Sequence, residues 1–404
     1  MPEYRNVALK KSAAYKFNHI QRQQDNTAAR AAPGWIYINA IDERAGAGQA
    51  AFERSFIDWL CTRTDQPVFV LPSAARRGMR HFHRVGLNKR SKLGYLTHQW
   101  RLYRTLRKIR AAYGPLPLYF RSSGILVAPL LFARRYGLPL TLRLGPGHYD
   151  VLFYHRIPRF LHRPLAAYYA WVIRKADRIV VVTDQIRRTL IETYGTAPDK
   201  ITVLPNPANV TVFQDAVRPH PTAAAHTMGY VGSLHKYQGI DQVLLALGRL
   251  AASHRLPDDF QFMLVGDGPD RTRLEQLSAR HALQQYVHFI GRVPQSELPQ
   301  YYHRFRFAVA PYTAAFNSVK GSSALKVAEY LYFDLPVLAA DIADYRFLTR
   351  HRLGSLYRLD DVDSLAEALA DWLIHPPDRV AGRTFVLEHR APAVIFRAYL
   401  KIIS

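Results

Sequence analysis

Short apolar runs alternate with longer amphipathic segments along most of the chain. The runs in the first half are WIYINAI (35–41), PVFVLP (67–72), PLYFR (117–121), LPLTLRL (138–144), ADRIVVVT (176–183) and KITVLPN (200–206). They are continuous rather than alternating, which is typical of strands buried on both faces of a parallel sheet. Helical patterns fill the intervals between them. Strands that alternate with helices in this way predict a doubly wound α/β domain.

The second half repeats the pattern. Its predicted strands are MGYVGSL (228–234), DFQFMLVGDG (259–268), VHFIG (287–291), FAVAPY (307–312) and PVLAAD (336–341). Between the two series, residues 206–227 are polar, contain three prolines and lack periodicity, which is typical of a linker. We therefore expect two doubly wound, Rossmann-like domains. The expected parts are a basic arm (1–33), an N-terminal domain (34–210), a linker (211–227), a C-terminal domain (228–385) and a final helix (386–404) that packs back on the N-terminal domain.

Charge is distributed unevenly between the halves. The net charge is +24, and residues 1–215 contain 34 Lys and Arg against 13 Asp and Glu, which gives +21 for that half. Such a basic surface attracts a polyanion, either nucleic acid or the anionic face of a membrane. Ordinary solvated faces are the alternative. The chain shows no helix-turn-helix, zinc-finger or RNA-binding aromatic signature, which argues against nucleic acid as the partner.

The composition and the N-terminal sequence indicate the cellular compartment of the protein. The single cysteine, Cys61, excludes a disulfide framework and a multi-cysteine zinc site, and it fits a reducing compartment. The first residues, MPEYRNVALKKSAAYKFN, lack the apolar core of a signal peptide. No stretch of 18 uncharged apolar residues occurs, so we expect no membrane span. These features favour a cytoplasmic protein.

Small residues follow several strands of the second half, where a ligand can approach the backbone. Such loops occur at 230–239, 264–270, 289–293 and 321–326. Neither a GxGxxG dinucleotide fingerprint nor a Walker lysine loop is present, which argues against hydride transfer and against a phosphate-loop ATPase. The one D-x-D sequence places Asp363 before a helical run, so we interpret Asp363 as a helix N-cap rather than as a metal ligand.

The segment SSALKVAEYLYFDLPV (322–337) carries Lys326 and Glu329 near the start of a predicted helix over 324–331. A solvated Lys–Glu pair on a surface helix is the simplest interpretation. A helix N-terminus that faces an anion, with the lysine beside it, is the alternative. The neighbouring motifs favour the alternative.

The order of these motifs resembles that of a known family. YVGSL, QGIDQVLLAL, LVGDGP, VHFIGRV, ELPQYY, VAPY and SALKVAEYLYFDLPVLAAD follow one another as in the donor domain of GT-B fold glycosyltransferases of the retaining family 4 type. The segments ADRIVVVTDQIRRTL and KITVLPNP resemble the family's approach to its linker. The resemblance covers most of the chain and is strongest from Gly229 to Asp341. It implies a GT-B fold, in which two doubly wound Rossmann-like domains face each other across a cleft. It also implies transfer of a sugar from a nucleoside diphosphate sugar.

The resemblance also implies roles for particular residues. Lys326 and the helix N-terminus neutralise the departing diphosphate, Glu329 accepts hydrogen bonds from ribose hydroxyls, and His148 positions the reacting sugar. The expected donor-binding residues are Gly232, Ser233, Lys236, Gly266, Asp267, Gly268, Arg292, Val293, Ser322, Ser323, Ala324 and Leu325. The expected acceptor or phosphate loop contains Gly46, Ala47, Gly48 and Asp150. The resemblance implies no metal and no cofactor, since the helix N-terminus and Lys326 neutralise the charge. It also implies no dedicated catalytic base, because the departing phosphate oxygen takes the acceptor proton.

Three positions depart from the family pattern. Gly321 stands where relatives commonly have a glutamate, Ser233 where they have a basic residue, and Gln238 where they have a lysine. Lys236 and Lys326 are candidates to compensate for the lost charge. The departures leave open an unusual donor or an inactive homologue.

We therefore expect a retaining, metal-independent hexosyltransferase that acts on an anionic or lipid-linked glycan acceptor. Its expected setting is bacterial-type surface polysaccharide or lipopolysaccharide synthesis, at the inner face of the cell membrane as a peripheral protein. A nucleic-acid-binding protein and a nucleotide-sugar epimerase on the same fold are the alternatives.

Overall fold

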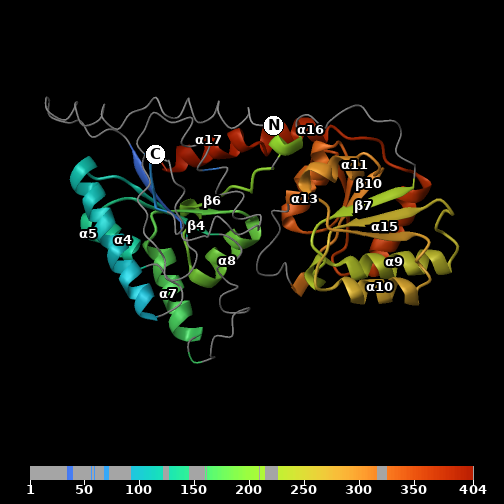
Figure 1. Cartoon of the computed structure of the whole chain (residues 1–404), viewed down its shortest axis with the longest axis horizontal. Helices are drawn as coiled ribbons and strands as arrows, with labels where there is room; N and C mark the ends of the chain where they lie inside the picture. Colours follow the sequence, from blue (N-terminus) through green and yellow to red (C-terminus); the bar gives the residue numbers. More distant parts are fainter. Residues whose placement is uncertain are drawn as a thin grey trace, which may run out of the picture. The chain divides into compact units, whose positions relative to one another are not determined.

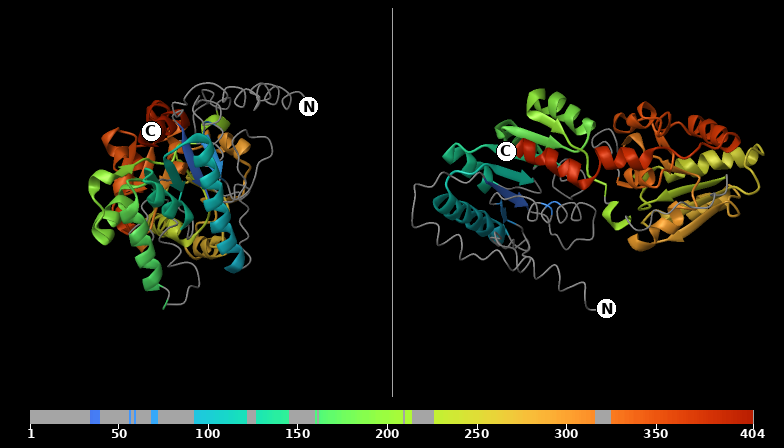
Figure 2. Two further views of the ribbon diagram at one scale, coloured as in Figure 1. Left: turned by 90° about the vertical axis from the view of Figure 1, so that its left-hand side faces the viewer. Right: turned by 90° about the horizontal axis from the view of Figure 1, so that it is seen from above.

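Each half of the chain forms a six-stranded sheet with helices around it (Figures 1 and 2). Contacts divide the chain into two compact units, Met1–Leu142 with Ile403–Ser404 and Arg143–Ile402. The computed structural model describes residues 34–39, 56, 59, 68–71, 92–121, 127–144, 160, 162–208, 210–213, 226–315 and 325–403. The predicted basic arm, and most of the predicted linker, lie outside these residues.

The first sheet has the strand order β2-β1-β3-β4-β5-β6. Its strands are β1 (Trp35–Asn39), β2 (Val68–Leu71), β3 (Leu118–Arg121), β4 (Leu140–Leu144), β5 (Arg178–Val181) and β6 (Ile201–Val203). β1 pairs in parallel with β2 and with β3, and β5 pairs in parallel with β6. The side chains of β3 and β4 are buried, as expected for strands covered on both faces.

Helices of the first half are α4 (Lys92–Tyr113), α5 (Ala128–Tyr136), α7 (His162–Lys175) and α8 (Asp184–Tyr194). α4 packs against α5, and α7 packs against α8. The ends of α8 follow from local chemistry. Thr183 Oγ1 accepts a hydrogen bond from the Ile186 amide at 3.2 Å, and Gly195 ends the helix at a φ of 60°, where a side chain would be strained.

The second sheet has the order β12-β11-β10-β7-β8-β9, and its strands pair in parallel. The strands are β7 (Thr227–Val231), β8 (Gln261–Val265), β9 (Val287–Gly291), β10 (Phe307–Ala310), β11 (Val337–Ala340) and β12 (Gly354–Tyr357). This is the order of a Rossmann sheet, in which the direction of strand addition reverses between β7 and β10.

Helices cover both faces of the second sheet. They are α9 (Ile240–Ala252), α10 (Arg271–Arg280), α11 (Leu298–Tyr302), α13 (Leu325–Tyr332), α14 (Phe347–Arg350), α15 (Val362–Ile374) and α16 (Gly382–His389). The last helix, α17 (Pro392–Ile403), instead contacts the first sheet, where Arg178 of β5 donates a hydrogen bond to the Ile402 carbonyl. α9 packs against α10 and α15, and α13 packs against α16. Figure 1 shows these two groups on opposite sides of the strands. The buried faces of the helices and the strands form one hydrophobic core.

The helix N-cap predicted at Asp363 is wrong. α15 begins at Val362, and its N-cap is Asp361, whose carboxylate accepts a hydrogen bond from the Ser364 amide at 2.8 Å. This bond, with help from Arg358, lowers the pKa of Asp361. Asp363 lies in the first turn and pairs with Arg249. Both aspartates precede the apolar run, and the sequence could not distinguish which one had an extended backbone.

The predicted fold class is confirmed, since both sheets have the expected α/β arrangement. The predicted domain boundaries stay predictions. None of the helices in the described ranges is long and apolar enough to cross a membrane.

Candidate functional site

The reversal of strand order in the second sheet marks where a ligand can bind. β7 and β10 are neighbours, with Met228 beside Phe307, and the sheet extends from this pair in opposite directions. In open α/β sheets, ligands bind beyond the carboxyl ends of the strands at such a point. The loops after β7 (232–239) and after β10 (311–315) flank it. α13 is the helix that follows β10, so its first turns belong to the same region.

Lys326 turns inward to these loops. Its Nζ donates a hydrogen bond to the Tyr230 hydroxyl at 3.2 Å and another to Gln238 Oε1 at 2.5 Å. The same nitrogen lies 4.4 Å from the centre of the Tyr230 ring and 5.3 Å from that of Tyr312. Tyr230 is the fourth residue of β7, and Tyr312 follows β10. The ammonium group is therefore held at the ends of the two strands where the sheet order reverses.

The environment of Lys326 disfavours its charge. The residue is partly buried, and desolvation lowers its pKa from 10.5 to about 7. Its ring contacts and neutral hydrogen-bond acceptors replace water only partly, and none of them carries a negative charge. A bound anion would supply that charge. Among the described residues, Lys326 has neutral partners and no carboxylate partner.

Glu329 contacts α11 rather than the strand ends. The Tyr302 hydroxyl donates to Glu329 Oε2 at 2.7 Å, and Tyr302 is fully buried. Desolvation raises the pKa of Glu329 from 4.5 to about 7, while the hydrogen bond from Tyr302 opposes this rise. The second carboxylate oxygen, Oε1, can accept hydrogen bonds from a ligand. A buried carboxylate that is held by one hydroxyl suits the recognition of a diol.

α13 is fastened to β7 through Tyr330. The Val231 amide donates to the Tyr330 hydroxyl at 2.8 Å, and this hydroxyl donates in turn to the Val231 carbonyl at 3.3 Å. Lys326, Glu329 and Tyr330 are spaced so that they share one side of the helix. The simplest interpretation of Lys326 and Glu329, a solvated pair, is therefore wrong, because the amine contacts Tyr230 and Gln238 while the carboxylate contacts the buried Tyr302 of α11.

The glycines after β7 and β8 let two loops pack against each other. The Gly232 amide donates to Val265 at 2.9 Å, and the Gly266 amide donates to Gly291 at 2.8 Å. Gly266 has a φ of +137°, and a Cβ there would lie 1.9 Å from the Gly232 carbonyl oxygen; at Gly268 a Cβ would lie 2.2 Å from that of Leu234. These glycines have a structural reason to be present, whatever ligand they border.

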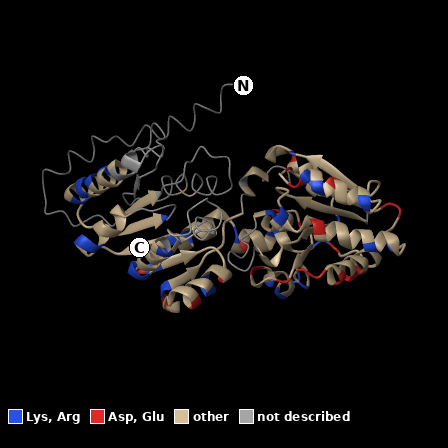
Figure 3. Cartoon of the chain, turned by 90° about the horizontal axis from the view of Figure 1, so that it is seen from below, with Lys and Arg blue, Asp and Glu red and all other residues tan. Residues whose placement is uncertain are grey.

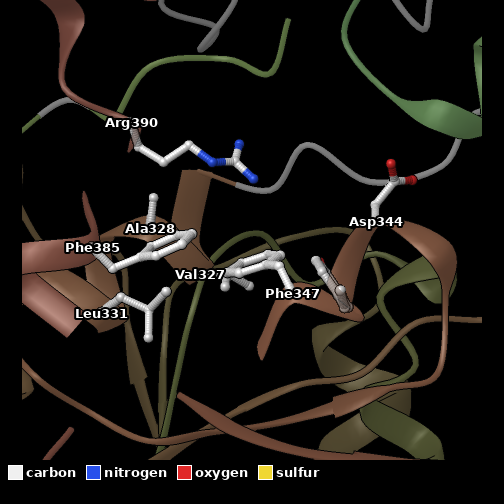
Figure 4. A pocket seen from close by; sticks show the side chains of 8 residues that line it. Val327, Ala328, Leu331, Asp344, Phe347, Phe385 and Arg390 are labelled. Carbon is white, nitrogen blue, oxygen red and sulfur yellow. The ribbon is translucent and has the colours of Figure 1, made fainter. Parts of the chain in front are cut away.

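The other side of α13 borders a small hollow, which Figure 4 shows from close by. Val327 and Leu331 form part of its lining, and the Phe347 and Phe385 rings stack with centroids 5.2 Å apart. The Arg390 guanidinium lies 5.4 Å from the Phe347 ring, and burial lowers its pKa to about 10. Rings close this side of the helix. The side that carries Lys326 and Glu329 meets Gln238 after β7 and Tyr312 after β10 through the lysine, and Tyr302 of α11 through the glutamate.

Some of the remaining predicted site residues are described by the structure, and others lie outside the described ranges. Ser233, Lys236, Asp267 and Arg292 are exposed, and the Tyr230 hydroxyl donates to the Ser233 carbonyl at 3.1 Å, so Tyr230 joins Ser233 to Lys326. Val293 packs against the core, and Leu325 begins α13. The predicted residues outside the described ranges are Gly46, Ala47, Gly48, His148, Asp150, Ser322, Ser323 and Ala324.

Sequence reasoning missed the aromatic walls of the site. Tyr230, Tyr302 and Tyr312 were not selected, although each contacts Lys326 or Glu329. Gln238 was noted only as a departure from the family, yet it is a hydrogen-bond partner of Lys326. Tyr230, two residues before Gly232, and Tyr312, two residues after β10, had a local signal in the sequence, whereas Tyr302 on α11 had none.

Comparisons with known proteins agree with this architecture. A model of the family "Glycosyltransferase Family 4" matches residues 48–212, and a model of "Glycosyl transferases group 1" matches residues 225–375. D-inositol 3-phosphate glycosyltransferase from Thermobispora bispora is 29% identical over 230 residues, which cover 52% of this chain and 51% of that protein. 2-deoxystreptamine glucosyltransferase from Streptomyces kanamyceticus is 28% identical over 185 residues, 43% of this chain and 47% of that protein. The chain thus spans about half the length of these curated relatives.

A solved structure extends the likeness to nearly the whole chain. The apo form of the lipopolysaccharide outer core galactosyltransferase WaaB has a TM-score of 0.65 and 14% sequence identity, covering 92% of this chain and 99% of that one. At this identity the likeness shows the fold alone. Because glycosyltransferase family models match both halves, and the fold is shared along nearly the full length, the chain belongs to the GT-B fold glycosyltransferases of the family 4 and group 1 type.

Proposed function

We propose that this protein transfers a sugar from a nucleoside diphosphate sugar to a glycan acceptor, with retention of configuration and without a metal ion. The observation that carries the proposal is the position of Lys326, a desolvated amine held where the strand order of the second sheet reverses. The leaving group of such a reaction is a nucleoside diphosphate, which gains negative charge as the glycosidic bond breaks. A cation held in place before the reaction stabilises that charge.

The amine of Lys326 can compensate for the positive charges that relatives have at the positions of Ser233 and Gln238 and that this chain lacks. Its contact with Gln238 supports this idea, because the amine reaches the side chain that stands where relatives have a lysine. A diphosphate beside Lys326 would restore its positive charge by raising its pKa. Charge neutralisation would then arise from α13 instead of the loop after β7.

Glu329 would hold the nucleoside. Its free oxygen can accept a hydrogen bond from a ribose hydroxyl, and Tyr302 fixes the orientation of the carboxylate. Because both residues are held by buried groups, the site changes little on binding. Pre-organisation of this kind lowers the entropy cost of holding the donor.

We infer that the acceptor is anionic or lipid-linked and is met at a membrane surface. The excess of Lys and Arg over Asp and Glu in the first half supports this inference. The fold shared with a lipopolysaccharide galactosyltransferase supports a setting in surface polysaccharide or lipopolysaccharide synthesis.

The test is donor binding, followed by transfer. Thermal shift measurements with uridine, guanosine and adenosine diphosphates and their sugars should show stabilisation by one base series, and Lys326→Met and Glu329→Gln should each abolish it. Arg280→Gln, an exposed cation on α10, is the matched control and should keep the shift. A shift that survives both site substitutions would place the donor elsewhere and overturn the proposal.

Transfer itself needs a separate measurement. The identified donor, incubated with membrane glycolipid extract in the presence of EDTA, should yield a product whose anomeric configuration by NMR matches the donor's. Inverted configuration would contradict retention, and activity that EDTA abolishes would contradict metal independence. Binding without transfer or donor hydrolysis would favour an inactive homologue.

A further inference from the structure

In the first half of the chain, α4 and α5 pack against each other along their length. Gln99 Oε1 accepts hydrogen bonds from the Val127 and Ala128 amides at 3.1 and 3.0 Å, so α4 caps the start of α5. Farther along, the guanidinium of Arg110 lies 4.2 Å from the centre of the Tyr136 ring at the end of α5. The two helices therefore run side by side, as Figure 1 also shows.

The outer surface of this pair is basic. α4 buries Leu102, Leu106 and Ile109 and exposes a stripe at helical spacing, and α5 adds two exposed arginines. The exposed cations, here called the basic face, are Arg101, Arg104, Arg107, Lys108, Arg134 and Arg135. Figure 3 shows the blue positions recurring along α4.

The part of the sequence that forms the basic face contains no acidic residue that would offset its positive charge. From residue 66 to residue 149 the chain contains 16 Lys and Arg and no Asp or Glu. Among the described residues, none of the six cations of the basic face has a carboxylate partner. An ordinary solvated face usually mixes both signs, so an unbalanced stretch of this length points to an anionic partner.

Two large apolar side chains stand among these cations. Trp100 on α4 is 58% exposed and Leu131 on α5 is 48% exposed. The Arg104 guanidinium lies 4.6 Å from the centre of the Trp100 ring. Because Gln99 contacts the start of α5, Trp100 and Leu131 belong to neighbouring turns of the two helices. An exposed tryptophan could stack on an unpaired base, but an exposed leucine contributes neither to base stacking nor to phosphate contacts. A lipid interface takes up both Trp and Leu beside Lys and Arg.

We propose that the outer surface of α4 and α5 docks on an anionic lipid bilayer, with the basic face against the headgroups and Trp100 and Leu131 inserted at the interface. The helix pair lies in the plane of the membrane and does not cross it. This deepens the membrane encounter proposed above by naming the surface. It is tested without any sugar transfer, so its failure leaves the proposed donor chemistry untouched.

The experiment is co-sedimentation of the full-length chain with phosphatidylcholine vesicles that contain or lack phosphatidylglycerol. The triple substitution Arg104→Gln, Arg107→Gln and Lys108→Gln should weaken binding to the anionic vesicles roughly 100-fold, since each cation near such a surface contributes about 1 kcal/mol. The matched control, Arg280→Gln, Arg304→Gln and Arg350→Gln, removes the same charge from exposed positions of the second half. It should keep nearly full binding. Circular dichroism of each variant checks that the fold is intact.

A second variant separates the lipid from other polyanions. Trp100→Ala with Leu131→Ala should reduce vesicle binding several-fold without changing binding to a labelled DNA duplex, measured by fluorescence anisotropy. Equal losses in the two triple variants, equal binding to vesicles with and without phosphatidylglycerol, or vesicle binding indifferent to Trp100 and Leu131 would each overturn the proposal. Duplex binding tighter than vesicle binding, lost in the same triple variant, would assign the surface to nucleic acid instead.

Discussion

Replacement of Lys326 by methionine should make the unliganded protein more stable while it removes donor binding. Methionine keeps most of the length and apolar volume of the side chain and removes only the amine. The amine is costly in the empty site, because burial lowers its pKa from 10.5 to about 7. Groups placed for a ligand commonly reduce stability in this way.

The magnitude follows from the shift in pKa. A change of 3.5 units corresponds to about 4.8 kcal/mol for the fully charged amine, and to about 4.4 kcal/mol at pH 7, where the folded protein holds half a proton there. This is an upper limit, because water still reaches the partly buried residue. The variant also loses the bonds to Tyr230 and Gln238, worth about 1 kcal/mol each. We expect a net stabilisation of about 1–2 kcal/mol at pH 7.

The sign of the pH dependence gives a sharper test. Between the folded pKa near 7 and the unfolded value of 10.5, the unfolded chain binds more protons at this site, so wild-type stability rises with pH. The advantage of the variant should shrink by about 2 kcal/mol from pH 7 to pH 9. Hydrogen exchange measured by mass spectrometry on peptides from α13 and β7 reports the local free energy of opening.

Lys236→Met provides the control, since Lys236 is an exposed lysine close by in the loop after β7. It should change stability by less than about 0.5 kcal/mol and show no pH-dependent difference. If Lys326→Met instead destabilises α13 at pH 7, or its difference from wild type stays constant up to pH 9, then Lys326 is not the desolvated amine argued for here.

Three further predictions follow from the same site. Donor binding should take up nearly one proton at pH 8, because Lys326 must gain its charge there while Glu329 is already ionised, and the affinity should weaken above pH 7 by up to about tenfold per pH unit. Calorimetry in buffers of different ionisation enthalpy measures the uptake, and an affinity that does not change from pH 7 to 9 would contradict it. Tyr302→Phe removes the hydrogen bond that lowers the pKa of Glu329, so the pH below which donor binding is lost should rise and the affinity should fall about tenfold. If the pH at which binding is lost does not change, Tyr302 does not position Glu329. Gly266→Ala should cost about 2–4 kcal/mol through the clash with the Gly232 carbonyl, whereas Gly137→Ala, with a positive φ but open space, should cost about 1 kcal/mol; equal costs by thermal unfolding would refute the packing argument.

Most of the fold could be predicted because buried parallel strands leave continuous apolar runs in the sequence. RIVV became β5 and FAVA became β10, within the predicted segments. β12 was missed for the same reason. It is an edge strand, and three of its four residues are only partly buried, so GSLY has no apolar run to mark it. The middle of α4 was difficult to recognise as an amphipathic helix, because residues 104–110 (RTLRKIR) are mostly basic. Its buried residues nevertheless recur three or four positions apart between the arginines.

The partners in the site could not be predicted in the same way, because they come from distant parts of the chain. Lys326 is 96 residues from Tyr230 and 88 from Gln238, and only the adjacency of β7 and β10 brings them together. A local pattern can select a lysine and a glutamate three residues apart, but it cannot say whether they bond to each other. That outcome depends on what each side chain meets across the sheet.

The separation of Lys326 from Glu329 is what makes the site chemically useful. Two such residues three apart on an exposed helix would neutralise each other and give little stability or function. Here the phenol of Tyr302 holds the carboxylate, and neutral groups on β7 and its loop hold the amine. Each charge is therefore suppressed separately, with both pKa values near 7. A nucleoside diphosphate offers an anion to one and a diol to the other, so a single ligand can satisfy both groups where the empty protein satisfies neither.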